Sequence, residues 1–215
     1  MNVKAKKHLG QNFLTDKNVV KRILLAANVT KNDLVVEVGP GRGILTKELA
    51  KSAKKVIAVE LDARLIPLLK EELRDFPNVE IIHADALHFT PPSAPYKLVA
   101  NLPYYISSPL LNHFIKEQFL ARGNPPISAT VMLQKEVAEK LCAAPPNMNV
   151  LACNIQPFGT ATYEFTVKRG AFNPIPKVDS AVTHIEIYQR PLVKDYDAYS
   201  ALVSAGFSQK RKQLW

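Results

Sequence analysis

Short apolar runs alternate with amphipathic stretches along most of the chain. The apolar runs have the length of β-strands and cover residues 34–38, 56–59, 79–82, 96–100 and 129–133. Apolar side chains at helical spacing follow most of these runs, in the stretches 44–50, 65–73, 107–115 and 135–141. Strands that alternate with helices in this way predict βαβ units, in which a mostly parallel sheet carries helices on both faces. The sequence therefore predicts a doubly wound, Rossmann-like α/β fold.

Both ends of the chain add elements to this repeat. Thr15 and Asp16 are typical of a helix N-terminus, and apolar residues recur at helical spacing over 19–27. Residues 164–167 and 181–188 are rich in β-branched and aromatic side chains, which predicts an antiparallel hairpin at the sheet edge. A last helix is expected over 193–207. We expect one main domain over residues 1–190 and a basic helical tail over 191–215.

Composition narrows the class of protein. Hydrophobic residues make up 47% of the chain and charged residues 22%, as in soluble globular proteins, and no apolar run approaches the ~20 residues of a membrane helix. No apolar segment follows the first lysines, so the N-terminus does not resemble a secretory signal and a cytoplasmic protein is expected. Cys142 and Cys153 lack the spacing of metal ligands, and no metal site is expected.

The formal net charge of +9 favours a polyanionic partner, because lysine and arginine release counterions when they contact phosphates. The basic residues concentrate at three places, namely Lys4, Lys6 and Lys7, then Lys168 and Arg169, and finally Lys210, Arg211 and Lys212. Charge alone leaves nucleic-acid binding open, since many basic proteins bind none.

Polar residues end four successive strands of the predicted sheet, and they are Gly39, Glu60, Asp85 and Asn101. Ligands of such folds bind beyond the carboxyl ends of the strands. Glycines at 39, 41 and 43 allow close approach of the backbone, and Glu60 can accept hydrogen bonds from both ribose hydroxyls. A glycine turn alone is weak evidence, because dinucleotide-binding proteins share it, and Asp85 equally suits a turn or helix cap.

The segment Asn101-Leu-Pro-Tyr104 carries the most specific chemistry. The N6 amine of adenine is a poor nucleophile, because its lone pair is delocalised into the ring. Hydrogen-bond acceptors that favour a pyramidal nitrogen would stabilise the transition state of its methylation. The Asn101 side-chain oxygen and the carbonyl of Leu102 or Pro103 could be these acceptors, and Tyr104 could stack on an unpaired or flipped base.

These residues belong to a series of motifs through which the chain resembles the ribosomal RNA small-subunit adenine dimethyltransferase family from about Lys7 to the C-terminus. The motifs are His8-Leu-Gly-Gln-Asn-Phe-Leu14, Glu37-Val-Gly-Pro-Gly-Arg-Gly43, Val59-Glu-Leu-Asp62, His83-Ala-Asp85, Asn101-Leu-Pro-Tyr-Tyr-Ile-Ser-Ser-Pro109 and Phe172-Asn-Pro-Ile-Pro-Lys-Val-Asp-Ser180. The resemblance implies transfer of two methyl groups from S-adenosyl-L-methionine to each of two adjacent adenosines near the 3′ end of small-subunit rRNA. It also implies a role in ribosome biogenesis on the immature small subunit.

The resemblance assigns a role to each matching position. The cofactor would contact Gln11, Asn12, Leu14, Gly39, Gly41, Glu60, Leu61, Asp85, Ala86 and Asn101. Asn101, Leu102, Pro103 and Tyr104 would be catalytic, and Tyr104 and Phe172 would hold the target base between their rings. We expect a monomer that binds no membrane.

The chain departs from the family pattern at two places. Residues 143–158 lack the tyrosine-glycine-arginine-leucine-serine-like run expected there, so the family pattern does not extend through this loop. The basic run that ends at Trp215 continues in the family into a small helical C-terminal domain, so residues 191–215 are expected to be the start of a truncated domain.

Three other functions compete with this interpretation. A relative that methylates large-subunit RNA and confers macrolide resistance would share the pocket. An RNA-binding assembly factor could retain the fold without catalysis, although the intact Asn101–Tyr104 segment argues against it. A nicotinamide dehydrogenase is disfavoured, because the glycine turn lacks the G-x-G-x-x-G pattern.

Overall fold

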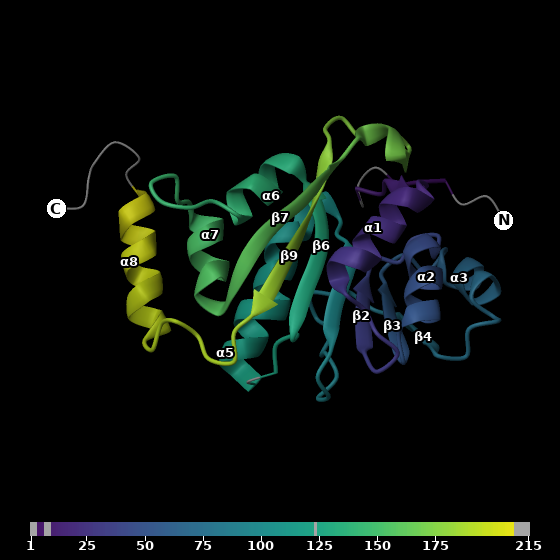
Figure 1. The fold of residues 1–215 in the computed structure, drawn as a ribbon, viewed down its shortest axis with the longest axis horizontal. Coiled ribbons are helices and arrows are strands. Elements are labelled where there is room, and N and C mark those ends of the chain that lie inside the picture. The colour runs from purple at the N-terminus through teal and green to yellow at the C-terminus, as the bar shows by residue number, and fades with distance from the viewer. Residues whose placement is uncertain (1–3, 7–9, 123, 209–215) are drawn as a thin grey trace.

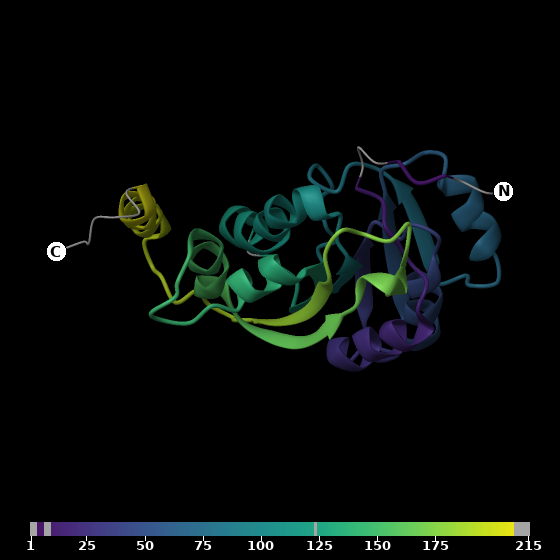
Figure 2. The ribbon, with the colours of Figure 1, turned by 90° about the horizontal axis from the view of Figure 1, so that it is seen from above.

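A seven-stranded sheet forms the centre of the structure (Figures 1 and 2). The computed structural model describes residues 4–6, 10–122 and 124–208. In spatial order the strands are β4 (Val79–His83), β3 (Lys55–Glu60), β2 (Leu34–Val38), β5 (Lys97–Asn101), β6 (Ser128–Gln134), β9 (Ser180–Ile187) and β7 (Gly159–Val167). The first five are parallel, whereas β9 runs antiparallel to both β6 and β7. This arrangement confirms the predicted doubly wound α/β fold with an antiparallel edge.

The central strands are apolar throughout because both faces of the sheet are covered. On β2, Val35 packs with α1 (Lys17–Ala27) and α2 (Ile44–Ser52), whereas its neighbour Val36 packs in the cluster on the opposite face. That second face is covered by α4 (Ser107–Leu111), the π-helical turn η3 (Asn112–Glu117), α5 (Gln118–Arg122), α6 (Lys135–Leu141) and α7 (Val150–Ile155). Successive strand residues point to opposite faces, so a run without alternation predicts two covered faces.

The remaining elements are short or lie at the periphery. They are α3 (Ile66–Glu72), η2 (Tyr104–Ile106), η4 (Gln156–Phe158), η5 (Arg169–Ala171), α8 (Tyr196–Ser208) and the two-stranded pair β1 (Phe13–Leu14) and β8 (Phe172–Asn173). Helix α8 lies at the end of the molecule far from α1–α3 (Figure 1) and contacts α7. None of the helices in the described ranges is long and apolar enough to cross a membrane.

Local hydrogen bonds explain where element boundaries differ from the predicted ones. Helix α8 begins at Tyr196 rather than at residue 193, because the Asp195 carboxylate accepts a hydrogen bond from the Ala198 N–H at 3.0 Å. Helix α7 was not predicted, although Asn149 caps it by accepting from the Ala152 N–H at 3.1 Å. An asparagine followed by an apolar segment was therefore a usable signal in the stretch that departs from the family pattern.

The pairing of β1 with β8 joins the start of the chain to a segment about 160 residues later. Leu14 pairs with Phe172, and the Thr15 N–H donates to the Ala171 carbonyl at 2.8 Å. The Phe172 side chain is 2% exposed and packs in the same core cluster as Leu14 and α1. The ring is therefore enclosed in this arrangement, and its predicted contact with the target base stays a prediction.

Replacing this ring tests its structural role. We expect Phe172→Ala to lower the free energy of unfolding by about 3–5 kcal/mol, because the substitution leaves a cavity between β8 and α1. Urea denaturation of the purified variant measures the loss. Phe207→Ala on α8 is the matched control, since that side chain is 39% exposed, and equal stability losses in the two variants would contradict the core assignment.

Candidate active site

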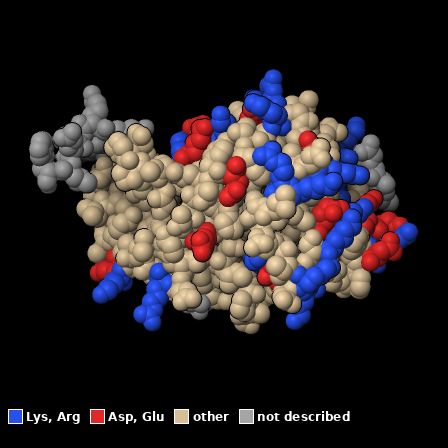
Figure 3. All heavy atoms as spheres, in the orientation of Figure 1, with Lys and Arg blue, Asp and Glu red and all other residues tan. Residues whose placement is uncertain are grey.

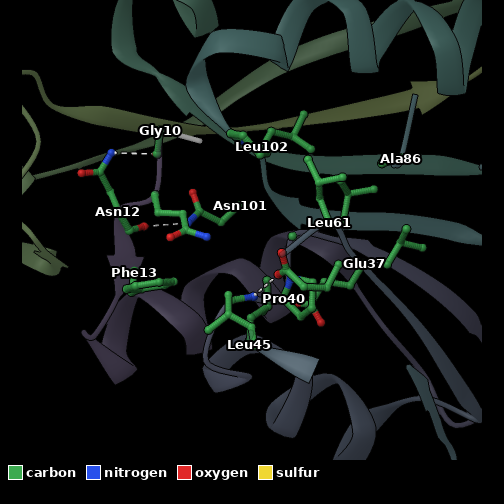
Figure 4. A pocket seen from close by; sticks show the side chains of 18 of the residues that line it. Gly10, Asn12, Phe13, Glu37, Pro40, Leu45, Leu61, Ala86, Asn101 and Leu102 are labelled. Atoms are coloured by element: carbon green, nitrogen blue, oxygen red, sulfur yellow. Dashed lines mark hydrogen bonds between the residues drawn. The ribbon is translucent and has the colours of Figure 1, made fainter. Parts of the chain in front are cut away.

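One pocket collects the polar residues that end the parallel strands (Figure 4). Its volume, including the open mouth, is about 950 Å³, near the upper end of the range for small-molecule sites. The pocket is lined by every residue predicted to bind cofactor or to be catalytic, namely Gln11, Asn12, Leu14, Gly39, Gly41, Glu60, Leu61, Asp85, Ala86, Asn101, Leu102, Pro103 and Tyr104. Of the predicted site residues, Phe172 alone does not line it. The parallel register therefore brings together positions that lie up to 93 residues apart in the sequence.

Backbone N–H groups hold the carboxylate of Glu60 in a fixed orientation. Oε2 accepts from the Gly41 N–H at 3.2 Å, and Oε1 accepts from the Asp62 N–H at 2.8 Å. Each carboxylate oxygen has two lone pairs, so one on each oxygen stays available for a ligand hydroxyl. Burial raises the pKa of Glu60, although the N–H groups of Asp62 and Gly41 stabilise its charged form. This geometry suits a ligand that presents two neighbouring hydroxyls.

The glycine turn reaches Glu60 because its backbone is left-handed. Gly41 has φ +59°, and a side chain there would bring a Cβ within 3.1 Å of the Phe13 ring. Only glycine adopts this conformation at little cost, and here it also lets Phe13 pack over the turn. The turn therefore connects Glu60, at the end of β3, to Phe13 in the N-terminal part of the chain.

Glu37 opens the glycine motif, but no role was predicted for its carboxyl group. It lines the pocket although the residue is only 1% exposed, and its Oε2 has no hydrogen-bond partner among the described residues. Burial, together with the negative charge of Glu60, raises the pKa of Glu37 to about 8. A glutamate in the middle of an otherwise apolar strand was the signal that could have identified it.

Asp62 anchors the N-terminal segment over the pocket. The Gln11 Nε2 donates to Asp62 Oδ2 at 2.9 Å, and Arg64 donates to both carboxylate oxygens, at 2.9 and 2.6 Å. The hydrogen bonds from Arg64 hold the pKa of Asp62 well below its usual range. Asp62 does not cap the following helix, because α3 begins at Ile66 and its N-cap is Leu65. The carboxylate is instead buried as the partner of Gln11 and Arg64.

The far end of the pocket combines one carboxylate with apolar walls. Asp85 Oδ1 accepts from the Leu87 N–H at 2.9 Å, which is the turn role considered from the sequence. Asp85 is only partly buried and also lines the pocket, together with Ala86 and the 42%-exposed side chain of Leu61. A flat, partly polar ring would fit between these apolar side chains and the carboxylate.

Asn101 at the end of β5 faces the N-terminal segment. Its Nδ2 lies 3.5 Å from the carbonyl oxygen of Asn12, at the long limit of a hydrogen bond (Figure 4). With the amino group on that side, the side-chain oxygen is the end of the amide that can accept from a ligand. The Pro103 carbonyl already accepts from the Ile106 N–H at 3.2 Å, closing the turn η2. This contact favours the Leu102 carbonyl as the second acceptor.

The ring of Tyr104 is fixed by a contact with β9, near the carboxyl end of β6. Its hydroxyl lies 2.6 Å from Ser180 Oγ, a fully buried group at the start of β9. Burial raises the pKa of Tyr104, so the phenol stays neutral around neutral pH. The ring is therefore held at the pocket by a contact that no sequence pattern predicted.

Charged side chains of both signs share the face that carries α1, α2 and α3 (Figure 3). Of the basic groups noted in the sequence, Lys6 lies 3.5 Å from Asp62, and Lys168 pairs with Asp179 at 2.9 Å. Lys7 and residues 210–212 lie outside the described residues. Exposed lysines and arginines on α1 add to this face, and they are Lys17, Lys21 and Arg22.

The buried Glu37 carboxyl predicts a dependence of stability on pH. Between the usual pKa near 4.5 and the folded value of about 8, the folded protein keeps a proton that the unfolded chain has lost. Stability should therefore fall as pH rises through this window, by up to about 1.4 kcal/mol per pH unit from this group. We expect Glu37→Gln to flatten the profile measured by urea denaturation from pH 5 to 9. Parallel profiles for the two proteins would contradict a protonated Glu37.

Comparisons with known proteins agree with this site. The family model described as ribosomal RNA adenine dimethylase matches residues 2–215. A ribosomal RNA small subunit methyltransferase A from Listeria monocytogenes is 41% identical over 224 residues, covering 98% of this chain and 74% of the relative. The chain thus spans about three-quarters of that relative's length.

Two solved structures are also similar to the chain. A dimethyladenosine transferase from Plasmodium falciparum has a TM-score of 0.83 at 32% identity, covering 94% of this chain and 73% of that one. The 23S rRNA methyltransferase ErmE has a TM-score of 0.81 at 32% identity, covering 93% of this chain and 80% of that one. With a family model that matches nearly every residue and a relative above 40% identity, the chain belongs to the ribosomal RNA adenine dimethylase family.

Proposed function

We propose that this protein transfers methyl groups from S-adenosyl-L-methionine to N6 of two adjacent adenosines near the 3′ end of small-subunit rRNA, as a step in the assembly of the small subunit. The observation that carries the proposal is the convergence of Glu60, Asp85 and the Asn101–Tyr104 segment on one pocket. The first two suit an adenosine-containing cofactor, and the segment suits an adenine amine.

The residues present fit S-adenosylmethionine. Glu60 offers one lone pair on each oxygen for the two ribose hydroxyls, and Asp85 with Leu61 and Ala86 offers an acceptor and apolar walls for the adenine. The carboxyl group of Glu37 is buried, and its Oε2 has no partner among the described residues, so the neutral group can exchange a hydrogen bond with a polar group of the cofactor. When bound, the cofactor supplies an electrophilic methyl group attached to a positively charged sulfur.

The acceptors at the end of β5 make the target amine reactive. The Asn101 side-chain oxygen and the Leu102 carbonyl would each accept one N6 hydrogen, which favours a pyramidal nitrogen whose lone pair points at the methyl group. Asn101 is oriented by Asn12, and Leu102 by its N–H bond to the Met132 carbonyl at 3.1 Å. Fixed acceptors of this kind lower the barrier, because they need no reorganisation during the reaction.

Tyr104 holds the base in line with the acceptors. Its ring would stack on an adenine that is unpaired or flipped out of its helix, and the Ser180 hydroxyl fixes the plane of the ring. Positioning accounts for much of the rate in a reaction between two bound partners. We propose that Tyr104 supports the base alone in the arrangement described here, since Phe172 is buried in the core.

The charge of +9 supports an RNA substrate, since phosphate contacts account for much of the affinity of RNA-binding proteins. The similarity to ErmE keeps methylation of large-subunit RNA as a second candidate. The higher identity to small subunit methyltransferases favours the small subunit. Protection of a macrolide-sensitive strain upon expression of the protein would favour the second candidate.

The direct test is methyl transfer to immature subunits. We expect the protein to convert adenosines of unmethylated small subunits into N6,N6-dimethyladenosine in the presence of labelled S-adenosylmethionine. We expect Asn101→Ala to lower kcat by about 100-fold or more, because one transition-state acceptor is lost. Nuclease digestion and chromatography of the RNA measure the product, with large subunits assayed in parallel.

Asn32→Ala is the matched control, because Asn32 is exposed and lies before β2, at the end opposite the pocket. It should leave the rate unchanged. A wild-type protein that binds the cofactor but methylates neither subunit would favour the non-catalytic assembly factor. A folded protein that binds no S-adenosylmethionine in a calorimetric titration would overturn the proposal.

Two substitutions at Tyr104 separate the ring from its hydroxyl. We expect Tyr104→Phe to keep most of the activity, with a loss of about tenfold or less, because the ring remains and only the bond to Ser180 is removed. Tyr104→Ala should cost about 100-fold, because the stacking surface is lost. Single-turnover rates at saturating cofactor measure both. Equal rates for the two variants would show that the ring does not position the base.

A further inference from the structure

Tyr105 is a large aromatic residue of the pocket, and it has no role in the proposed methyl transfer. It follows Tyr104 in η2 and lines the pocket, yet 51% of it is exposed. Such a residue stands at the mouth rather than in the interior. Burial and the charges of Asp85 and Glu60, which line the same pocket, raise the pKa of Tyr105.

One edge of the Tyr105 ring lies against Gly10. A Cβ built on Gly10 would lie 3.1 Å from Cδ1 and 3.7 Å from Cε1 of the ring, so the glycine backbone packs directly against the aromatic edge. Gly10 has φ +59°, a conformation that other residues rarely adopt. The ring therefore spans the mouth from η2 to the N-terminal segment.

This segment, residues 10–14, is itself held in place beside the pocket, and we refer to it as the N-terminal strap. Gln11 is held by Asp62 at 2.9 Å, and the Asn12 Nδ2 donates to the Gly10 carbonyl at 3.2 Å (Figure 4). At its other end, Phe13 and Leu14 pair with β8. The strap is thus anchored at both ends, and its contact with Tyr105 lies at Gly10, next to the anchor at Gln11.

We propose that Tyr105 and Gly10 together form a gate over the nucleoside half of the cofactor pocket, and that this contact controls release of the cofactor. The inference rests on the proposed S-adenosylmethionine site. A ligand held by Glu60 and Asp85 would lie in the pocket that the ring partly covers, and the contact of the ring with Gly10 would hinder its release. Removing the ring therefore opens the mouth without changing any acceptor that holds the ligand.

Cofactor release is the direct readout. We expect Tyr105→Ala to raise the dissociation rate of labelled S-adenosylmethionine about tenfold, because an aromatic contact is lost, while Tyr105→Phe stays near wild type. The Michaelis constant for the cofactor should rise, whereas the Michaelis constant for RNA should not change. Leu120→Ala on α5 is the control, because Leu120 is 49% exposed and does not line the pocket.

Gly10 provides a second route to the same gate. Gly10→Ala should displace the ring and raise the dissociation rate in the wild-type background, and it should have little further effect in Tyr105→Ala. If the substitution acted only through backbone strain, its effect would be the same in both backgrounds, so the double-mutant cycle separates the two causes. Hydrogen exchange of residues 10–14 in the cofactor-free protein should be faster in Tyr105→Ala.

Three outcomes would overturn the gate while leaving the proposed function intact. They are an unchanged cofactor dissociation rate in Tyr105→Ala, additive effects of the two substitutions, or a higher Michaelis constant for RNA with unchanged cofactor release. The last result would assign Tyr105 to the RNA. Absence of cofactor binding by the wild-type protein would instead refute the proposed function itself.

Discussion

Parallel pairing of β3, β2 and β5 is the constraint on which the site depends. Parallel strands that are hydrogen-bonded in register end at one edge of the sheet, and each strand here ends in a polar residue or a glycine turn. The apolar residues between these ends are buried on both faces, so the register cannot slip without moving Val35 and Val36 to the wrong layers. Burial of the sheet therefore fixes the spacing of Glu60, Asp85 and Asn101, although these residues hardly touch one another.

Buried carboxylates at this edge differ because their partners differ. Glu60 and Asp62 lie two residues apart, yet burial raises the pKa of the first and Arg64 lowers the pKa of the second. Asp62 is consequently a stable anion that holds the strap, whereas Glu60 keeps lone pairs for a ligand. Glu37, with no cationic partner among the described residues, keeps its proton up to a pH of about 8. The three neighbouring acids thus differ in role because their partners differ. Asp62 holds the strap, Glu60 is the proposed acceptor for the ligand, and Glu37 is a titratable group.

The strap connects the two halves of the proposed reaction. On one side it is tied to Asp62 and touches Tyr105, next to the predicted cofactor nucleoside. On the other side its Asn12 carbonyl faces Asn101, which is the proposed acceptor for the target amine. The proposed closure over the cofactor and the orientation of the proposed catalytic amide therefore involve the same five residues. Tyr104 is held independently, through Ser180 on β9.

The sequence by itself determined the fold class, the parallel strands and most of the site. Hydrophobic periodicity reports burial directly, and strand ends in such a fold converge whatever the side chains around them, so Glu60, Asp85 and Asn101 could be placed together in advance. Only the tertiary structure decided the role of Asp62 as an anchor, the core position of Phe172 and the contact of Tyr105 with Gly10. Each of these depends on a contact between residues about 50 to 160 positions apart in the sequence. Such contacts result from the packing of elements against one another, and hydrophobic periodicity does not report them.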